Sequence, residues 1–369
     1  MRIGMIGLKG VPYPAGIENF TEQVGWRLSE RGHEVTVYVR PYVQVGDRFR
    51  GMRIRHLPSI NTKHLDALTH SAVASLAVLF EDVDIVHYHA LGPSVFSALP
   101  RLMGKKTIAH IHGLDWRRAK WSAFASRCLR AAEYAAVYFP HRTLAVSREL
   151  QGYLQQKYGK AVAYVPTGVE CYEYRPPQEI RRWGLDRDNY VLFLSRLVPE
   201  KGCHYLIEAF NQLKTGKRLV IAGSGTHTDA YEASLKRAAG PNVLFTGTVT
   251  GRTLEELFSN AYVYVLPSDV EGLPHTVLQA LSYGRCVVAS DIAPNLEALG
   301  GCGVTFAAGK PDELRKRLQY VLESPRLVAE QAGGARARTR DHYSWDSVVS
   351  RLEEIYAGCL DGAPGSGER

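Results

Sequence analysis

The sequence lacks the features of a membrane-spanning or disulfide-bonded chain. No run in its 369 residues reaches the ~18 consecutive apolar residues of a membrane-spanning helix. Its six cysteines are scattered without a close pair, which excludes a disulfide framework and a Cys-based zinc site and favours a reducing cytoplasm. The opening segment, MRIGMIGLKG, has no cleavage site and predicts a buried strand rather than a signal peptide.

The composition also lacks the polar bias of a disordered chain. Hydrophobic residues make up 45% and charged residues 22%, as in ordinary globular domains. A net charge of +8 favours anionic partners, namely nucleotides, phosphosugars, an anionic membrane surface or nucleic acid. Nucleic acid is not expected, because no helix-turn-helix signature and no aromatic-rich groove for single strands is present.

Short apolar segments alternate with helical patterns along the whole chain. Most of these segments are apolar on both faces, which is typical of parallel strands covered by helices on both sides. The alternation predicts an α/β protein with two doubly wound, Rossmann-like domains. The ten expected strands are 3–7, 35–39, 85–89, 107–112, 143–146, 190–195, 219–223, 243–246, 262–266 and 287–290.

The domain boundary is expected in the Pro-rich stretch 166–177, after which a new strand–helix series begins. We therefore expect an N-terminal domain at 1–168 and a C-terminal domain at 169–343. A final helix at 344–360 is expected to return to the N-terminal domain. The Gly-rich tail 361–369 is expected to be disordered.

Three loops carry residues suited to binding an anion. The first, after the first strand, contains Gly7, Gly10 and Gly16, but its spacing does not fit the GxGxxG pattern of NAD sites. The second, SRLVPEKG, places Arg196 and Lys201 at a strand's carboxyl end, where a planar fork and a mobile ammonium suit a diphosphate. Each loop taken alone is equally compatible with an ordinary turn.

The third loop is DVEGLPH, which leads into a helix. Pro274 is suited to the first helical position. The amides around Gly272 and Leu273 would then point outward at the positive end of the helix, where an anion is favoured. Glu271 before the helix and Gln279 one turn inside it place one hydrogen-bonding group on each side of these amides. That order suits sugar hydroxyls, phosphates and ribose hydroxyls of a nucleotide sugar.

The motifs SRLVPEKG, AGSGT, a Gly-Thr-Val turn at 247–249 and EGLPHTVLQALSYG occur in one order in the second half of the chain. Together they resemble the C-terminal half of family 4 retaining glycosyltransferases of the GT-B fold. The Gly-rich loop, HYHALGP and HIHGLDWRRAKW extend the resemblance to the N-terminal half. GIENF and HGLDWRRAKW resemble bacterial rhamnosyl- and other surface-polysaccharide glycosyltransferases of that family.

The resemblance implies roles for individual residues. Arg196 and Lys201 would bind the donor diphosphate, with Gly16 near it. Glu271 would contact sugar hydroxyls, the amides of Gly272, Leu273 and Pro274 would lie beside sugar and phosphate, and His112 would lie near the donor sugar. The remaining implied donor contacts are Gly223, Val249 and Gln279.

Gln279 departs from the family pattern, which has a second glutamate at this position. A glutamine can still bind a ribose hydroxyl, but without charge assistance. The departure leaves donor affinity and nucleotide preference open.

The resemblance and the missing acid–nucleophile carboxylate pair favour front-face transfer in which the leaving diphosphate accepts the acceptor's proton. No metal or other cofactor is expected. The expected partners are a nucleotide sugar and a saccharide or lipid-linked acceptor, and the setting is the cytoplasm, with contact to the inner face of the membrane. A sugar-nucleotide epimerase and a non-catalytic nucleotide-sugar-binding protein are the alternatives.

Other chemistry-bearing patterns have simpler interpretations. The triplets 82–84 and 186–188 match the Asp-x-Asp metal motif but precede strands, so we interpret them as polar loop ends. The pairs His87/His89 and His110/His112 could hold a metal, although a polar sheet edge is the commoner situation.

The stretch 115–160 is rich in Lys and Arg. It predicts a helix with an apolar stripe (Trp121, Phe124, Ala125, Cys128, Ala132) packed in the core and a solvated basic face (Lys120, Arg127, Arg130). Contact of this helix with an anionic membrane is the alternative.

Overall fold

The computed structural model describes residues 1–13, 15–62, 65–117, 123–225 and 228–361. The chain divides into two compact units. Unit 1 contains Met1–Gly168 and the segment from Trp345 onward, and unit 2 contains Val169–Ser344. Residues 362–369 of the predicted tail lie outside the described residues.

Unit 1 is built on an eight-stranded sheet in the order β3-β4-β2-β1-β5-β6-β7-β8. All neighbouring strands are parallel except the edge pair β3 and β4. The strand order changes direction between β1 and β5, which are neighbours in the sheet. The strands are β1 (Arg2–Ile6), β2 (Glu34–Val39), β3 (Arg48–Phe49), β4 (Met52–His56), β5 (Ile85–His89), β6 (Lys106–Ile111), β7 (Arg142–Ala145) and β8 (Val162–Tyr164).

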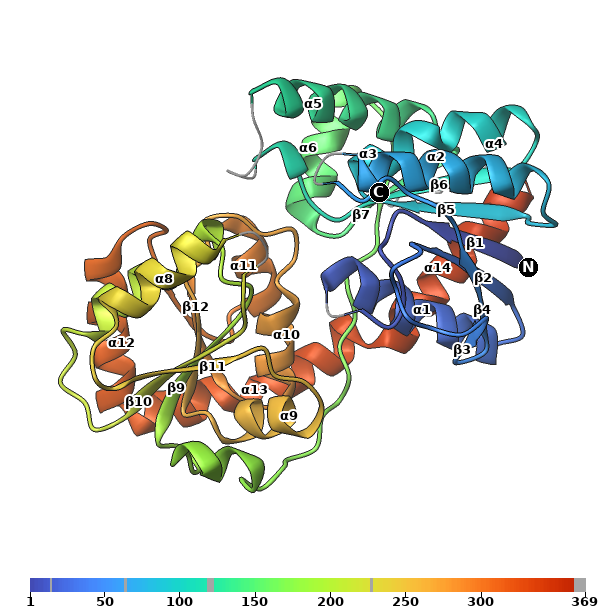
Figure 1. Ribbon diagram of the computed structural model, residues 1–369. Helices are drawn as coiled ribbons and strands as arrows, with labels where there is room; N and C mark the ends of the chain where they lie inside the picture. The colour runs from blue at the N-terminus through green and yellow to red at the C-terminus, as the bar shows by residue number, and fades with distance from the viewer. Residues whose placement is uncertain (14, 63–64, 118–122, 226–227, 362–369) are drawn as a thin grey trace. The chain divides into compact units, whose positions relative to one another are not determined.

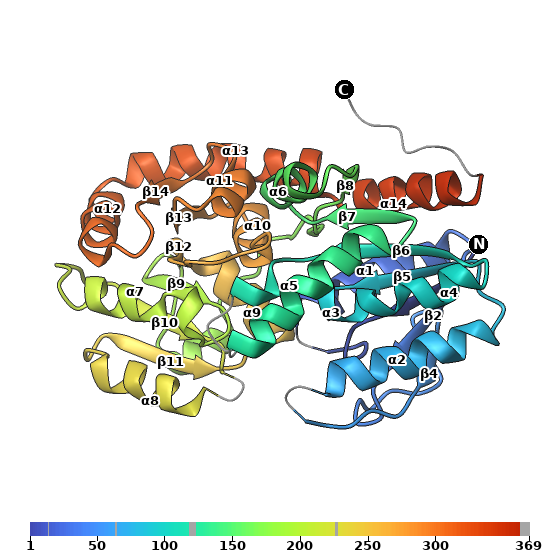
Figure 2. The same ribbon diagram turned by 90° about the horizontal axis from the view of Figure 1, so that it is seen from above.

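The helices of unit 1 lie on both faces of this sheet (Figure 1). Ile3 and Met5 share a core with α1 and α14, whereas Ile6 packs with α2 on the opposite face, as the alternation of a strand requires. The C-terminal helix α14 lies beside α1 against this unit (Figure 2). The helices are α1 (Gly16–Glu30), α2 (Asp66–Leu79), α3 (Leu91–Ser94), η1 (Val95–Ser97), α4 (Ala98–Leu102), η2 (Asp115–Arg117), α5 (Ala123–Tyr138), α6 (Arg148–Tyr158) and α14 (Trp345–Leu360).

Unit 2 has a six-stranded, all-parallel sheet in the order β11-β10-β9-β12-β13-β14. This is the Rossmann strand order, and it changes direction between β9 and β12. The strands are β9 (Tyr190–Leu194), β10 (Arg218–Ala222), β11 (Val243–Gly247), β12 (Val263–Leu266), β13 (Cys286–Ser290) and β14 (Val304–Phe306).

The helices of unit 2 surround its sheet (Figure 1). They are η3 (Glu179–Trp183), η4 (Pro199–Lys201), α7 (Cys203–Phe210), α8 (Asp229–Ala238), α9 (Gly251–Asn260), α10 (His275–Ser282), α11 (Ala293–Leu299), α12 (Pro311–Glu323) and α13 (Pro325–Tyr343). Within the described ranges, no helix combines the length and the apolar character needed to cross a bilayer.

The α/β fold class is confirmed, and each of the ten predicted strands coincides with a strand of the structure to within a few residues. Four strands were not predicted: β3, β4, β8 and β14. Three of these have only two or three residues, and β4 carries alternating Arg53 and Arg55 at the sheet edge, so none forms a recognisable apolar run.

The expected packing of the basic helix is wrong. Phe124 is 74% exposed and Cys128 is exposed, whereas the buried face of α5 is formed by Ala132, Ala135 and Ala136 in its second half. Burial begins where α5 carries Glu133, whose buried carboxylate accepts hydrogen bonds from Lys157, Tyr158, Tyr153 and Trp116. The predicted positions Lys120 and Trp121 lie outside the described residues.

Candidate active site

The strand order of unit 2 brings two of the predicted binding loops together. The loop with Arg196 and Lys201 follows β9, and the loop with Glu271 follows β12. These strands are parallel neighbours, so their carboxyl ends meet at one edge of the sheet. Because the strand order reverses between them, this edge is the crevice where open α/β sheets bind their ligands.

Lys201 and Glu271 form an ion pair at this edge. The Lys201 ammonium donates to Glu271 Oε1 at 2.5 Å, and the Ser268 hydroxyl donates to the same oxygen at 2.7 Å. Their side chains are only 13% and 8% exposed. The carboxylate therefore holds the Lys201 ammonium inward, whereas Arg196 is exposed to solvent.

Gly202 determines how the first loop approaches β12. The residue has a φ of 66°, and a Cβ atom there would lie 1.9 Å from the carbonyl oxygen of Pro267. The amide of Asp269 donates to the carbonyl of Glu200 at 2.9 Å. The two loops are therefore joined backbone to backbone, at a distance that only glycine permits.

Helix α10 begins one residue later than predicted. Pro274 has a ψ of 94° and caps the helix from outside, so His275 is the first helical residue. The side chain of Leu273 is only 8% exposed and anchors the turn that precedes the helix. The backbone between Glu271 and Pro274 lies at the positive end of the helix, where partial charges favour an anion.

The other predicted donor residues follow neighbouring strands. Gly223 comes directly after β10, has a φ of 129° and donates its amide to Gly247 at 2.8 Å. Val249 is half-buried in the loop between β11 and α9. Gln279, on α10, donates its amide to the Tyr172 hydroxyl at 3.4 Å. Unit 2 thus places its predicted donor residues in loops beyond the strands' carboxyl ends, except Gln279, which lies in the middle of α10.

Two residues beside Glu271 were not predicted. Ser268 holds the Glu271 carboxylate, and its own carbonyl accepts a hydrogen bond from Ser290 at 2.5 Å. Asp269 accepts a hydrogen bond from Tyr205 at 3.3 Å, and burial raises the pKa of its carboxyl. Both residues follow a buried strand directly, and this position was the sequence signal that could have identified them.

Two predicted residues belong to unit 1. Gly16 is exposed and is the first residue of α1. The loop before it is held by Glu18, a buried carboxylate that sequence reasoning missed and that accepts the amide of Lys9 at 3.1 Å. His112 follows β6, and its Nε2 lies 3.1 Å from His89 Nδ1. Burial, and after it the neighbouring His110 and His89, hold the pKa of His112 well below its usual range, so the ring is neutral at pH 7.

The two Asp-x-Asp triplets lie at the amino ends of β5 and β9, as predicted. Asp82 and Asp84 both pair with Arg2. Asp188 pairs with Arg187 and, at 3.7 Å, with Arg285. These carboxylates are thus engaged with arginines at the sheet edge opposite the candidate site.

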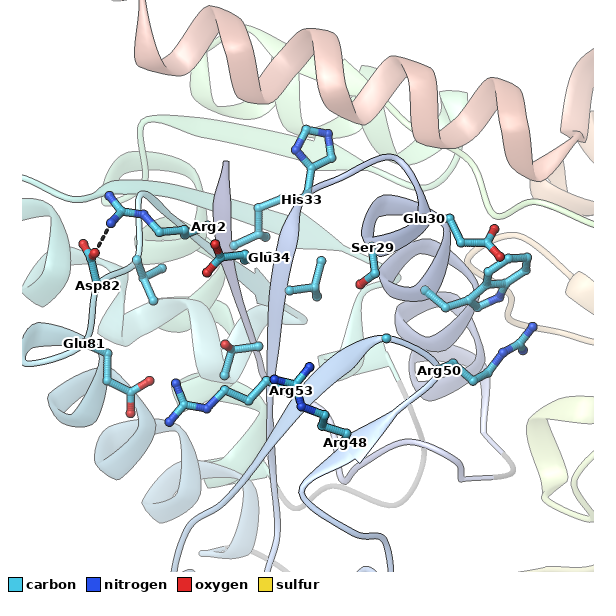
Figure 3. Close-up of a pocket in the computed structure, with 16 residues that line it drawn as sticks. Arg2, Ser29, Glu30, His33, Glu34, Arg48, Arg50, Arg53, Glu81 and Asp82 are labelled. Carbon is cyan, nitrogen blue, oxygen red and sulfur yellow. Dashed lines mark ion pairs between the residues drawn. The ribbon is translucent and has the colours of Figure 1, made fainter.

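A cavity of about 700 Å³ also lies at the amino ends of strands, in unit 1 (Figure 3). Its wall carries both signs of charge, with arginines from β1, β3 and β4 and carboxylates from the end of α1, the start of β2 and the segment before β5 (Figure 3). Because both signs of charge line the cavity, it gives no preference for an anion. The cavity also lies at the sheet edge opposite the loops that follow β1 and β6. The cavity is therefore not the predicted site.

Two family models match the chain, one in each half. The model "Glycosyltransferase Family 4" matches residues 14–173, and "Glycosyl transferases group 1" matches residues 177–338. Together they extend over most of the chain, in the same order as the predicted motifs.

Curated relatives match along nearly the full length. The GDP-mannose-dependent alpha-(1-6)-phosphatidylinositol monomannoside mannosyltransferase of Mycolicibacterium smegmatis is 26% identical, over 94% of this chain and 96% of that protein. An uncharacterized glycosyltransferase of Methanocaldococcus jannaschii is 25% identical, over 89% of this chain and 90% of that protein.

Solved structures share the fold. The sucrose-phosphate synthase of Thermosynechococcus elongatus has a TM-score of 0.84 at 18% identity and covers 98% of this chain and 100% of its own. The Anabaena protein HepE, solved with UDP-glucose, has a TM-score of 0.80 at 18% identity and covers 97% and 100%. With both halves matched by glycosyltransferase models and two Rossmann-like units of this topology, the chain belongs to the family 4 glycosyltransferases of the GT-B fold.

Proposed function

We propose that the protein is a retaining glycosyltransferase that moves a sugar from a nucleoside diphosphate sugar to a hydroxyl acceptor. The observation that carries this proposal is the meeting of Arg196, Lys201 and Glu271 at the point where the strand order of unit 2 reverses. Two relatives support the donor class, since one is named as GDP-mannose-dependent and HepE was solved with UDP-glucose.

Each residue receives one role in this proposal. Arg196 and Lys201 bind the diphosphate, and the backbone from Gly272 to Pro274, with the amides of Gly272 and Leu273 as its donors, lies beside phosphate and sugar. Glu271 accepts hydrogen bonds from sugar hydroxyls. Gln279 contacts the ribose of the nucleoside, Gly16 lies near the diphosphate and His112 lies near the sugar. Gly223 and Val249 are the remaining donor contacts.

The proposed chemistry is front-face transfer. The acceptor hydroxyl attacks the anomeric carbon while the bond to the diphosphate breaks, and its proton passes to the leaving phosphate oxygen. Arginine, lysine and helix amides neutralise the charge that develops on the diphosphate. The transfer step therefore needs no divalent cation and no carboxylate nucleophile.

The acceptor is proposed to be a saccharide or lipid-linked saccharide of a polysaccharide or glycolipid made in bacteria. A phosphatidylinositol mannoside in the name of one relative agrees with a lipid-linked acceptor. We further propose peripheral contact with an anionic membrane on the cytoplasmic side, through α5, where Phe124 is exposed beside exposed Arg127 and Arg130.

Incubation with a panel of nucleotide sugars and hydroxyl acceptors tests the function. The expected result is sugar transfer to the acceptor with retained anomeric configuration, which NMR of the product measures. Formation of an epimer without acceptor would make the protein an epimerase. Binding of nucleotide sugars without any turnover across the panel would make it a binding protein and would contradict the proposal.

A further inference from the structure

Four histidines gather on one face of the unit 1 sheet. His87 and His89 alternate along β5, so they share a face with Ile85, which packs in the core beneath α1 and α14. His110 on β6 lies directly opposite His89. The rings of His87 and His89 have centroids 4.3 Å apart, and Phe20 of α1 packs edge-on against His110 at 4.9 Å. The proposed transfer reaction assigns a role only to His112, so three of these imidazoles have none.

Three buried ring nitrogens of this cluster have no hydrogen-bond partner among the described residues. They are His87 Nε2, His89 Nε2 and His110 Nδ1. All three side chains are 0% exposed. A buried polar atom without a partner loses its hydration without compensation, which destabilises the folded chain. Core packing alone would be served better by apolar side chains of similar size.

The second nitrogen of each of these three rings contacts a polar group outside the three-histidine set. His87 Nδ1 lies 2.8 Å from the hydroxyl of Tyr356, on α14. His110 Nε2 donates to the carbonyl of Val165 at 3.0 Å, which leaves its Nδ1 unprotonated. His89 Nδ1 lies 3.1 Å from His112 Nε2. Protons on the Nδ1 atoms of His87 and His89 satisfy both contacts and leave their Nε2 atoms unprotonated as well.

We propose that His87, His89 and His110 form a buried binding site for a divalent transition metal ion, with Zn²⁺ as the preferred ion. One nitrogen from each of the three rings lies within 4.8 Å of the others. Nitrogens that share one tetrahedral Zn²⁺ at Zn–N bonds of ~2.0–2.1 Å lie about 3.3–3.4 Å apart, so the three rings close the site by rotating toward one another. Imidazole donors suit Zn²⁺, Cu²⁺ and Ni²⁺, whereas Mg²⁺ and Ca²⁺ prefer oxygen ligands.

The surroundings match those of known imidazole sites. Metal-binding histidines usually donate their second nitrogen to a neighbouring acceptor, which orients the ring. Burial lowers the pKa of His110 to about 3 and holds the pKa of His87 and His89 well below the usual range, so the rings are neutral, as metal ligands must be.

The ion would tie β5 and β6 to α14, through His87 and Tyr356, and would fix the ring of His89 that contacts His112. It would stabilise the folded chain. It takes no part in neutralising the donor diphosphate, which the proposed function assigns to residues of unit 2.

The wild-type protein, depleted with a strong chelator and then equilibrated with Zn²⁺ alone, tests the site directly. We expect one equivalent of zinc to remain after desalting. A hundredfold excess of Zn²⁺ over Kd should raise Tm by roughly 3–7 °C. Co²⁺ in place of Zn²⁺ should bind with the same stoichiometry and give the visible absorption of a protein-bound Co²⁺ ion. Absence of bound zinc in both the re-equilibrated protein and protein expressed with added zinc would overturn the proposal.

Variants locate the ion. His89→Gln should abolish zinc binding, and His70→Gln, which alters another buried histidine, should retain it. Tyr356→Phe keeps the ring and removes only the hydroxyl at His87, so it should weaken zinc binding by about 10–100-fold. Its matched control is Tyr88→Phe, whose hydroxyl contacts Ser75 on the other face of β5. If Tyr356→Phe and His89→Gln both keep the zinc affinity of the wild type, the ion is bound elsewhere and the proposed site is contradicted. If His89→Gln does not fold, the zinc affinity of Tyr356→Phe compared with that of Tyr88→Phe decides the question.

Discussion

At the scale of single residues, the candidate site consists of one exposed cation and one buried ion pair. Arg196 is exposed, whereas the Lys201 ammonium is held against Glu271. A buried pair of this kind is costly to break from one side, because the remaining charge loses its partner. The two cations therefore differ in what their removal does.

Replacing Arg196 by alanine should lower kcat/KM by about 10²–10³, because a charge-assisted contact to the developing diphosphate charge is lost. Stability should hardly change, since the side chain is exposed. Lys201→Ala should lower kcat/KM at least as much and also destabilise the fold, because Glu271 is left unpaired. Lys214→Ala, an exposed lysine outside the site, is the control. Near-normal transfer by the Arg196→Ala, Lys201→Ala double variant would refute both assignments.

Glu271→Gln should lower kcat far more than it weakens binding of the free nucleoside diphosphate. The carboxylate is proposed to contact the sugar, and its loss releases Lys201 for the phosphates. Calorimetric titration with the nucleoside diphosphate and with the intact nucleotide sugar separates the two effects. An equal loss of affinity for both ligands would mean that Glu271 does not read the sugar.

His70 provides a pH-dependent prediction away from the site. Burial lowers its pKa to about 4, whereas an unfolded histidine titrates near pH 6.5. Between these values the unfolded chain binds the proton and the folded chain does not. The free energy of unfolding should therefore fall as the pH drops from 6.5 to 4, by up to about 3 kcal/mol from this residue, at ~1.4 kcal/mol per pKa unit.

Denaturant unfolding of wild type and His70→Gln at pH 7, 5.5 and 4 measures this term as the difference between the two pH profiles. The variant should lose less stability than wild type over this range. Parallel profiles would show that His70 has the same pKa in the folded and in the unfolded chain.

At the scale of elements, the site depends on how closely the loop after β9 approaches the loop after β12. Gly202 makes that approach possible, because its left-handed backbone and missing Cβ accommodate the Pro267 carbonyl. Sequence patterns identify such a glycine only as a turn residue.

Gly202→Ala should cost roughly 1–3 kcal/mol of stability through backbone strain and should also weaken donor binding, since the displaced loop carries Lys201. Gly216→Ala is the matched control, because a Cβ atom there meets nothing within 4 Å and the backbone φ is ordinary. Thermal unfolding and nucleotide titration of both variants measure the effect. Equal behaviour of the two variants would show that the loops are not held by this contact.

At the scale of the whole molecule, the proposed transfer chemistry and the proposed zinc site make different demands on metals. Transfer should proceed at its full rate in the presence of EDTA without added Mg²⁺ or Mn²⁺, because cationic side chains neutralise the diphosphate. A rate that depends on millimolar Mg²⁺ or Mn²⁺ would contradict metal-free transfer. A different result would point to the histidine site instead: activity that is lost when metal is removed and is restored only by stoichiometric Zn²⁺, with no such restoration in His89→Gln.

The sequence by itself determined most of the elements and which polar and charged residues stand in the loops that follow them. Buried parallel strands are recognisable as short apolar runs, and Gly- and Pro-containing turns mark their ends, because both signals are local. Arg196, Lys201, Glu271 and Gly272 could therefore be proposed as donor contacts from local patterns together with the resemblance to a known family, and these roles remain predictions. Very short or charged edge strands such as β4 were missed, since they carry no such run.

Only the tertiary structure decided which of these residues meet. The pairing of β9 with β12 joins segments about 70 positions apart, through backbone hydrogen bonds that any apolar strand could make. The burial of Lys201 against Glu271, the exposure of Phe124 and the gathering of three histidines beneath α1 and α14 all follow from such pairings. A pattern along the chain reports what each residue can do, whereas the packing of distant strands and helices decides which groups lose water and which acquire a partner.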